Sequence, residues 1–167
     1  MKLTADNLIF AATLFAALGS GLMAGVFFAF SAFVMKALAR LSPVEGIAAM
    51  QSINVAVINP WFLAAFFGTA ATCVILTVST LFQWRRPGAG CLLFGSLLYL
   101  FGTMLVTIAF NVPKNEALAT VDPRSTEAAT VWTAYVTNWT NWNHVRTAAA
   151  FAAAASLTIS LRLACAP

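Results

Sequence analysis

The residues of this chain that could do chemistry are few, and several fall in one short segment. Residues 137–147 read TNWTNWNHVRT and include Asn143, His144 and Arg146. Histidine titrates near neutral pH, so His144 can act as a general base or general acid. Arg146 and Asn143 can stabilise an oxyanion in a site of low dielectric constant. Together these residue types indicate removal of a proton beside a stabilised negative charge, and we treat all three as candidate catalytic residues.

His144 is the only histidine of the chain, and two other roles for it stay open. A single histidine can be an axial ligand of haem, or a structural residue with a satisfied hydrogen bond. It cannot by itself form a zinc site, because three or four protein ligands are needed and no carboxylate or thiolate accompanies it. Cys73, Cys91 and Cys165 form no CxxC pattern and are predicted to act as small hydrophobic residues. We therefore predict no metal site.

The composition indicates an integral membrane protein. Of the 167 residues, 61% are hydrophobic and 8% are charged, and the mean hydropathy is +0.87. A soluble domain carries roughly a quarter charged residues, so this chain cannot build a surface that faces water. The nine Lys and Arg residues are spread over the ends of apolar segments and form no patch, which argues against nucleic acid as a partner.

The apolar segments predict an all-α fold, an integral membrane four-helix bundle that forms a single domain over residues 1–167. A span needs about 20 residues, and each of four segments is long enough. A short interfacial helix follows the first span, and the fourth helix is extended by an amphipathic segment. The predicted spans are residues 7–35, 60–83, 90–111 and 139–162; the interfacial helix covers 43–56 and the extension 125–138.

Several residues mark the ends of these helices. Ser42 stands directly before a proline and predicts a helix start, because proline is tolerated in a first turn. Asn59 likewise precedes a proline at the start of the second span, and Ser125 is a predicted N-cap. The pair at residues 87–88, Pro-Gly, predicts a turn between the second and third spans.

Glycines in two spans predict close helix packing. Gly21 and Gly25 form a small-xxx-small pair, which could serve packing within the chain or formation of a homo-oligomer. Gly95 and Gly102 are two turns apart and share one face of the third span.

Four spans bring most of the conspicuous polar residues to the same membrane face. The end of the first span, the start of the second, the end of the third and the start of the fourth must lie together there. We expect these residues to line one cavity near that face, with aromatic walls that include Phe27, Phe30, Trp61, Trp132 and Trp139. The polar residues are Asn54, Asn59, Asn111, Lys114, Asn115, Asn143, His144 and Arg146.

A helical projection of the fourth span, at about 100° per residue, gathers its aromatic and polar residues into one stripe. The stripe holds Trp132, Tyr135, Trp139, Trp142, Asn143 and Arg146. His144 falls on the neighbouring face with Thr140 and Thr147. Plainer interpretations remain open: the tryptophans could form an interfacial belt, and Asn59 and Asn111 could cap helix ends.

Four stretches make the chain resemble the anthrone oxygenase-like family of small membrane proteins, in its bacterial branch. They are VFFAFSAFVMKALARLSP, AAMQSINVAVINPWF, FNVPKNEAL and the pattern W-x-x-Y-x-x-x-W-x-x-x-N-H-V-R-T. The resemblance implies a four-helix bundle that oxidises a polycyclic aromatic anthrone to an anthraquinone with molecular oxygen and no conventional cofactor. Carried over by motif, the implied site residues are Asn54, Asn59, Asn111, Asn115, Trp139, Asn143, His144 and Arg146.

The predicted function is therefore a membrane oxygenase or oxidoreductase for a lipophilic aromatic, anthrone- or quinone-like substrate. His144, Arg146 and Asn143 are its catalytic candidates, and no cofactor is required. The substrate-binding candidates are Asn54, Asn59, Asn111, Asn115, Tyr135, Trp139 and Trp61. Two alternatives stay open: haem bound through His144, and a non-enzymatic subunit that binds a lipid or another small molecule.

The expected partners are the lipid bilayer, a lipophilic small molecule and oxygen. We expect a bacterial inner-membrane location. Lysine and arginine are equally frequent on the two sides, so their count sets no orientation. The tight pair Arg85 and Arg86 in a short turn favours cytoplasmic termini, which places the polar cluster toward the non-cytoplasmic face.

Overall fold

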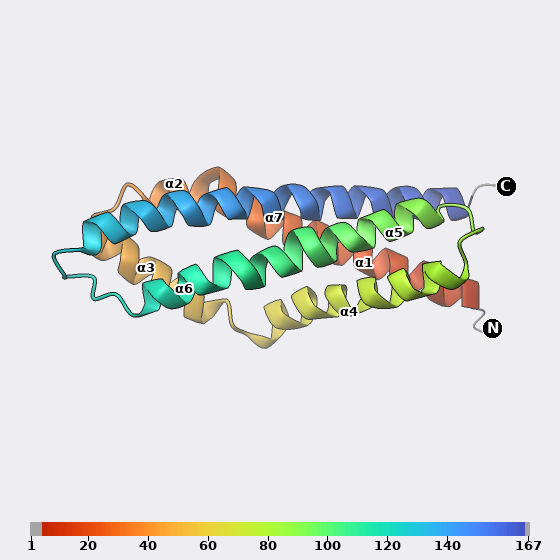
Figure 1. The fold of residues 1–167 in the computed structure, drawn as a ribbon, viewed down its shortest axis with the longest axis horizontal. Helices are drawn as coiled ribbons and strands as arrows, with labels where there is room; N and C mark the ends of the chain where they lie inside the picture. Colours follow the sequence, from red (N-terminus) through yellow and green to blue (C-terminus); the bar gives the residue numbers. More distant parts are fainter. Residues whose placement is uncertain (1–4, 166–167) are drawn as a thin grey trace.

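The chain folds into a bundle of long helices that run side by side (Figure 1). A computed structural model describes residues 5–165, and all regular structure within them is helical. The elements in order are α1 (Ala5–Ala29), the π-helical η1 (Phe30–Val34), α2 (Met35–Leu38), α3 (Pro43–Ala56), α4 (Pro60–Phe82), α5 (Ala89–Leu97), the π-helical η2 (Leu98–Leu105) and η3 (Thr107–Asn111), α6 (Val112–Ala119) and α7 (Ala128–Ala164). The predicted all-α membrane bundle is confirmed.

Within residues 5–165, four helices are long and apolar enough to cross a membrane, which confirms the predicted number of spans. They are Asp6–Leu38, Pro60–Phe82, Ala89–Ala119 and Ala128–Ala164. The start of α1 and the end of α7 lie at one end of the bundle with the α4–α5 connection, while α3 and α6 lie at the other end (Figure 1). The end that holds α3 and α6 is the one at which the conspicuous polar residues were predicted to gather.

Two predicted helix starts are confirmed by their caps. Ser42 caps α3 in a capping box: its hydroxyl accepts from the backbone N–H of Glu45, and the Glu45 carboxylate accepts from the Ser42 backbone N–H. Hydrogen bonds from the Ser42 hydroxyl and backbone N–H hold the pKa of Glu45 below its ordinary value. Asn59 caps α4 by accepting from the N–H of Phe62 at 3.0 Å. At the predicted turn, Gly88 adopts a φ of +81°, which favours glycine.

The third span is longer than predicted. The predicted third span ended at residue 111. Instead the helix continues through Pro113 to Ala119. Two π-helical segments, η2 and η3, precede the proline. Such wide turns relax the regular hydrogen-bond pattern and are frequent at functional sites. Because the helix continues, α6 forms part of the wall of the site.

The fourth helix begins at Ala128, with Glu127 at the N-cap position, so the prediction of Ser125 as N-cap is wrong by two residues. Its 37 residues give a length of about 55 Å. A hydrocarbon core is only about 30 Å thick, so α7 extends well beyond a span. Its first third packs on α3 and α6 and buries Ala128, Trp132 and Tyr135 in a second hydrophobic core.

Small residues set the distance between the helices, although not all the expected ones do. A Cβ on Gly95 would lie 2.9 Å from Cγ of Leu157, and one on Gly102 would lie 2.5 Å from Cβ of Ala149, so both glycines permit close approach to α7. A Cβ on Gly21 or Gly25 would meet no atom within 4 Å. Among the described residues, therefore, this pair does not set the distance to another helix.

Candidate functional site

The inner face of α7 carries the polar residues of the site. Tyr135, Trp139, Asn143 and Arg146 are spaced by four, four and three residues, which places them on one side of a helix. All four are buried. Trp142, which the projection placed in the same stripe, is only half-buried and stacks on Phe110, with ring centres 3.6 Å apart.

Arg146 is surrounded by dipoles and aromatic faces. One guanidinium nitrogen, Nη2, donates to Oδ1 of Asn143, and Nη1 donates to Oγ1 of Thr107 at 3.3 Å. The guanidinium carbon lies 4.2 Å from the ring centre of Phe27 and 5.0 Å from that of Trp139. Desolvated contacts of this kind contribute about 2 kcal/mol or more. They offset part of the cost of burying the charge.

No acid neutralises this arginine within residues 5–165. The ion pair found there joins Arg86 to Asp6, at the other end of the bundle. Nε of Arg146 is buried and has no hydrogen-bond partner among the described residues. A buried cation costs free energy unless something pairs with it. Arg146 is therefore suited to meet an oxygen atom, or a negative charge, on a bound molecule.

Asn143 ties the fourth span to the first. Its Nδ2 donates to the carbonyl oxygen of Phe27 at 2.7 Å and to Oγ of Ser31 at 2.7 Å. Oγ of Ser31 also lies 3.2 Å from Oγ1 of Thr147. With both ends of its amide engaged, Asn143 is held in one orientation, and it in turn fixes Arg146.

Two further asparagines join α7 to the third span. Oδ1 of Asn115 accepts from the Tyr135 hydroxyl at 2.9 Å and from Nε1 of Trp139 at 2.8 Å. Nδ2 of Asn111 donates to the Trp139 carbonyl at 3.2 Å, while its Oδ1 is buried and has no partner in the part of the chain that the structure describes. These bonds fix the Trp139 ring, which also lies 5.6 Å, between ring centres, from Phe30.

A cavity of about 450 Å³ opens beside this network. Ligand sites commonly have 300–1,000 Å³ and apolar walls with a few polar groups, and this cavity fits that description. Apolar side chains from α1, η1, α3 and α4 form most of its wall, including Phe27, Phe30, Met50 and Phe66. Its polar lining residues are Gln51, Asn54, Thr107, Asn115, Glu116 and Arg146. Nδ2 of Asn54 is buried and unpartnered among the described residues.

The structure brings most of the predicted site residues together, in two roles. Asn54, Asn115, Trp139 and Arg146 line the cavity. Asn111, Asn143 and Tyr135 stand behind them and hold Trp139, Arg146 and Asn115 through the hydrogen bonds described above.

His144 does not join this cavity. Its side chain is exposed, and it lines neither of the two cavities described for this chain. The reason is helix geometry: residues two positions apart differ by about 200° in direction, so His144 and Arg146 cannot both face inward. The expectation that the imidazole lies beside the guanidinium in one cavity is wrong, while haem ligation by His144 stays a prediction.

Four other predicted residues also lie outside the cavity: Lys114, Trp132, Trp61 and Asn59. Trp61 is 87% exposed in the first turn of α4 and does not line it. Asn59 is the N-cap of α4 and donates to the carbonyl oxygen of Ala56 at 3.0 Å. The plainer interpretation of Asn59, a helix cap, is the one that its contacts support.

Three polar residues of the cavity were not predicted from the sequence: Gln51, Thr107 and Glu116. Glu116 follows Asn115 directly and lies beyond residue 111, the predicted end of the third span, so it was not expected on a helix of the bundle. Gln51 donates through Nε2 to the carbonyl oxygens of Leu118 at 2.8 Å and Val121 at 3.0 Å. It thereby attaches α3 to the end of α6.

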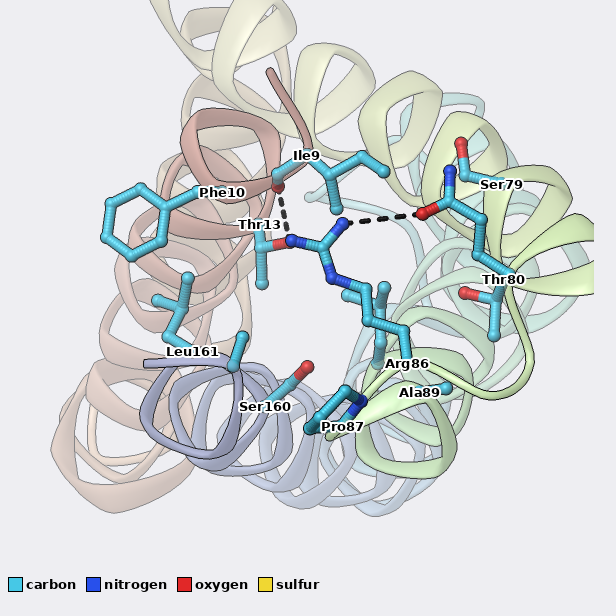
Figure 2. A pocket seen from close by; sticks show the side chains of 13 residues that line it. Ile9, Phe10, Thr13, Ser79, Thr80, Arg86, Pro87, Ala89, Ser160 and Leu161 are labelled. Carbon is cyan, nitrogen blue, oxygen red and sulfur yellow. Dashed lines mark hydrogen bonds between the residues drawn. The ribbon is translucent and has the colours of Figure 1, made fainter. Parts of the chain in front are cut away.

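The opposite end of the bundle has a cavity of only about 20 Å³, room for about one water molecule. Figure 2 shows the Arg86 side chain reaching across it toward Ile9 and Thr13. Nη1 of Arg86 lies 3.1 Å from Oδ1 of Asp6 and 3.5 Å from Oε1 of Gln83. The cavity described at this end is too small for a substrate.

A comparison with known proteins adds the family. The family model described as anthrone oxygenase matches residues 61–156, more than half of the chain. The chain belongs to the anthrone oxygenase family. The matched region holds Asn111, Asn115, Asn143 and Arg146, but not Asn54. No curated protein and no solved structure matches the chain.

Proposed function

We propose that this anthrone oxygenase family member is a membrane-embedded oxygenase that oxidises a lipophilic aromatic ketone of the anthrone type with molecular oxygen. The observation that carries the proposal is the buried guanidinium of Arg146 at the wall of a largely apolar cavity, without a carboxylate partner among the described residues. Such a cation is suited to a charge that develops during a reaction, because it needs no reorganisation when the charge forms.

The chemistry of such a ketone suits this arrangement. Loss of a proton from the ring carbon opposite the carbonyl turns the ketone into an enolate, which is electron-rich enough to reduce oxygen without a further cofactor. The negative charge of the enolate rests on the former carbonyl oxygen. Arg146, held by Asn143 and Thr107, is the donor available to that oxygen. The aromatic walls at Phe27 and Phe30 would contact the ring faces.

The proposal extends to the orientation in the membrane. With the termini cytoplasmic, the pair Arg85 and Arg86 lies on the cytoplasmic side, as the distribution of positive charge in short loops favours. The cavity then lies toward the non-cytoplasmic face, at the end of the bundle that holds α3 and α6 (Figure 1).

The test is oxygen uptake by the purified protein in detergent micelles, with anthrone as the probe and a protein-free blank subtracted. The unmodified protein should consume one oxygen molecule for each anthraquinone formed. Arg146→Met removes the charge while keeping an apolar stem. It should lower kcat/KM by roughly 10²- to 10³-fold, the effect of losing one oxyanion donor.

Arg124→Met is the matched control, because Arg124 is exposed in the α6–α7 loop at the same end of the bundle. It should leave the rate unchanged. Equal rates for the two variants would remove Arg146 from the reaction. If the unmodified protein binds anthrone but takes up no oxygen above the blank, the oxygenase proposal fails and the non-enzymatic binding role replaces it.

A further inference from the structure

We infer that Glu116 is the general base of this site, the catalytic residue that removes the proton from the ring carbon of the substrate. The inference rests on the proposed oxygenase function and adds to it the group that the reaction needs and that His144 does not supply. Glu116 belongs to α6 and comes directly after Asn115.

Glu116 is the lining residue whose side chain can accept a proton. Among the residues that line the cavity, only Glu116 and Arg146 carry ionisable side chains. A guanidinium is always protonated in proteins and has no acceptor, so Arg146 cannot be the base. The Glu116 side chain has no hydrogen bond or ion pair within residues 5–165, and it is exposed. Its carboxylate is therefore free to receive a proton and to exchange it with water.

The position of Glu116 is fixed from both sides. The preceding residue, Asn115, is held by Tyr135 and Trp139 through its Oδ1. After Glu116, the carbonyl of Leu118 accepts from Gln51 at 2.8 Å. These bonds set the rotation of α6, so that the same helix presents Asn115 and Glu116 to one cavity.

The two ionisable groups stand at separate points of the wall. Arg146 contacts Thr107, and Glu116 follows Thr107 by nine residues on the same continuous helix. At 1.5 Å per residue this places Glu116 roughly 13 Å along the helix from Thr107, the residue that Arg146 contacts. Two extended side chains with a ring between them can fill that distance. A ketone whose carbonyl oxygen meets Arg146 would therefore present the opposite ring carbon toward Glu116.

The proposed reaction balances with oxygen as its oxidant. Glu116 takes a proton from the ring carbon, and the electron pair moves to the carbonyl oxygen beside Arg146. The enolate passes one electron to oxygen, and the resulting superoxide and carbon radical combine into a C–O bond. The peroxide anion takes the proton from Glu116. The carboxylate then removes the second hydrogen from the same carbon as a proton, and the O–O bond breaks to give the new carbonyl and a hydroxide ion. The hydroxide takes that proton back from Glu116 and leaves as water.

Glu116→Gln tests the inference, because it keeps the shape of the side chain and removes its basicity. We expect kcat with anthrone to fall by about 10²- to 10⁴-fold, the usual worth of a general base, with KM little changed. Glu127→Gln is the matched control: Glu127 is exposed at the start of α7, outside the cavity, and this variant should keep the full rate. Elution volume and circular dichroism show whether each variant is folded.

A second variant separates a base from a residue that only shapes the cavity. Glu116→Ala should be inactive and should regain activity when formate is added, because formate supplies a carboxylate to the vacated space. If Glu116→Gln takes up oxygen with the kcat of the unmodified protein, Glu116 is not the base, and the proposed oxygenase function is unaffected. No uptake by the unmodified protein refutes the proposed function and, with it, this inference.

Discussion

Replacing Asn143 by Ala tests whether the buried amide holds the first and fourth spans together. The side chain is 0% exposed and makes two bonds to the first span and one to Arg146. A hydrogen bond between membrane helices contributes about 0.6 kcal/mol on average, so the bonds to Phe27 and Ser31 account for about 1.2 kcal/mol. A bond to a charged group contributes about 1.5–3 kcal/mol. The free energy of unfolding should therefore fall by about 3–4 kcal/mol.

Asn138→Ala provides the matched comparison on the same helix. Asn138 is exposed and donates only to the carbonyl of Ala134 in its own helix, at 2.9 Å. Its loss should change stability by less than about 0.5 kcal/mol. The measurement is unfolding in mixed micelles by titration with sodium dodecyl sulfate, followed by tryptophan fluorescence.

Asn143→Asp separates the contribution of the bond to Arg146 from that of the bonds to Phe27 and Ser31. The carboxylate keeps an acceptor for Arg146 but can no longer donate to Phe27 and Ser31, so its stability should lie between those of the unmodified protein and Asn143→Ala. If Asn143→Ala is as stable as Asn138→Ala, the network around Arg146 does not stabilise the bundle, and the reasoning that assigns it this role is refuted.

Two further outcomes can be checked with single changes. Gly95→Ala should destabilise the bundle, because its Cβ would lie 2.9 Å from Leu157, whereas Gly21→Ala should be neutral or stabilise the helix by up to about 1 kcal/mol. The same unfolding titration measures both variants. Equal destabilisation by the two changes would show that Gly21 is also packed. In inverted and right-side-out vesicles, a membrane-impermeant maleimide should modify the exposed Cys165 only from the cytoplasmic side; modification from the outside would reverse the proposed orientation.

Much of the architecture could be predicted from the sequence. Apolar segments of sufficient length, separated by charged residues, specify helices that cross a membrane, because an unpaired backbone group in lipid is costly. The caps at Ser42 and Asn59 were also predictable, since capping depends on a few neighbouring residues. The convergence of Asn54, Asn115 and Arg146 follows from the number of spans alone.

Which residues line the cavity depends on the direction of each side chain, and the local sequence pattern does not give that direction. His144 and Arg146 are close in sequence, yet the packing of α7 buries Arg146 and leaves His144 exposed. The helix also continues through Pro113, because two π-helical segments precede it. That continuation carries Glu116 to the cavity wall.

The sequence by itself determined that this protein spans a membrane with four helices and gathers its polar residues at one end, since hydrophobicity and length act locally along the chain. Tertiary structure alone decided which polar groups share the cavity, because that depends on the rotation of each helix against its neighbours. The bonds from Asn143 to the first span and from Asn115 to α7 set those rotations between residues far apart in sequence.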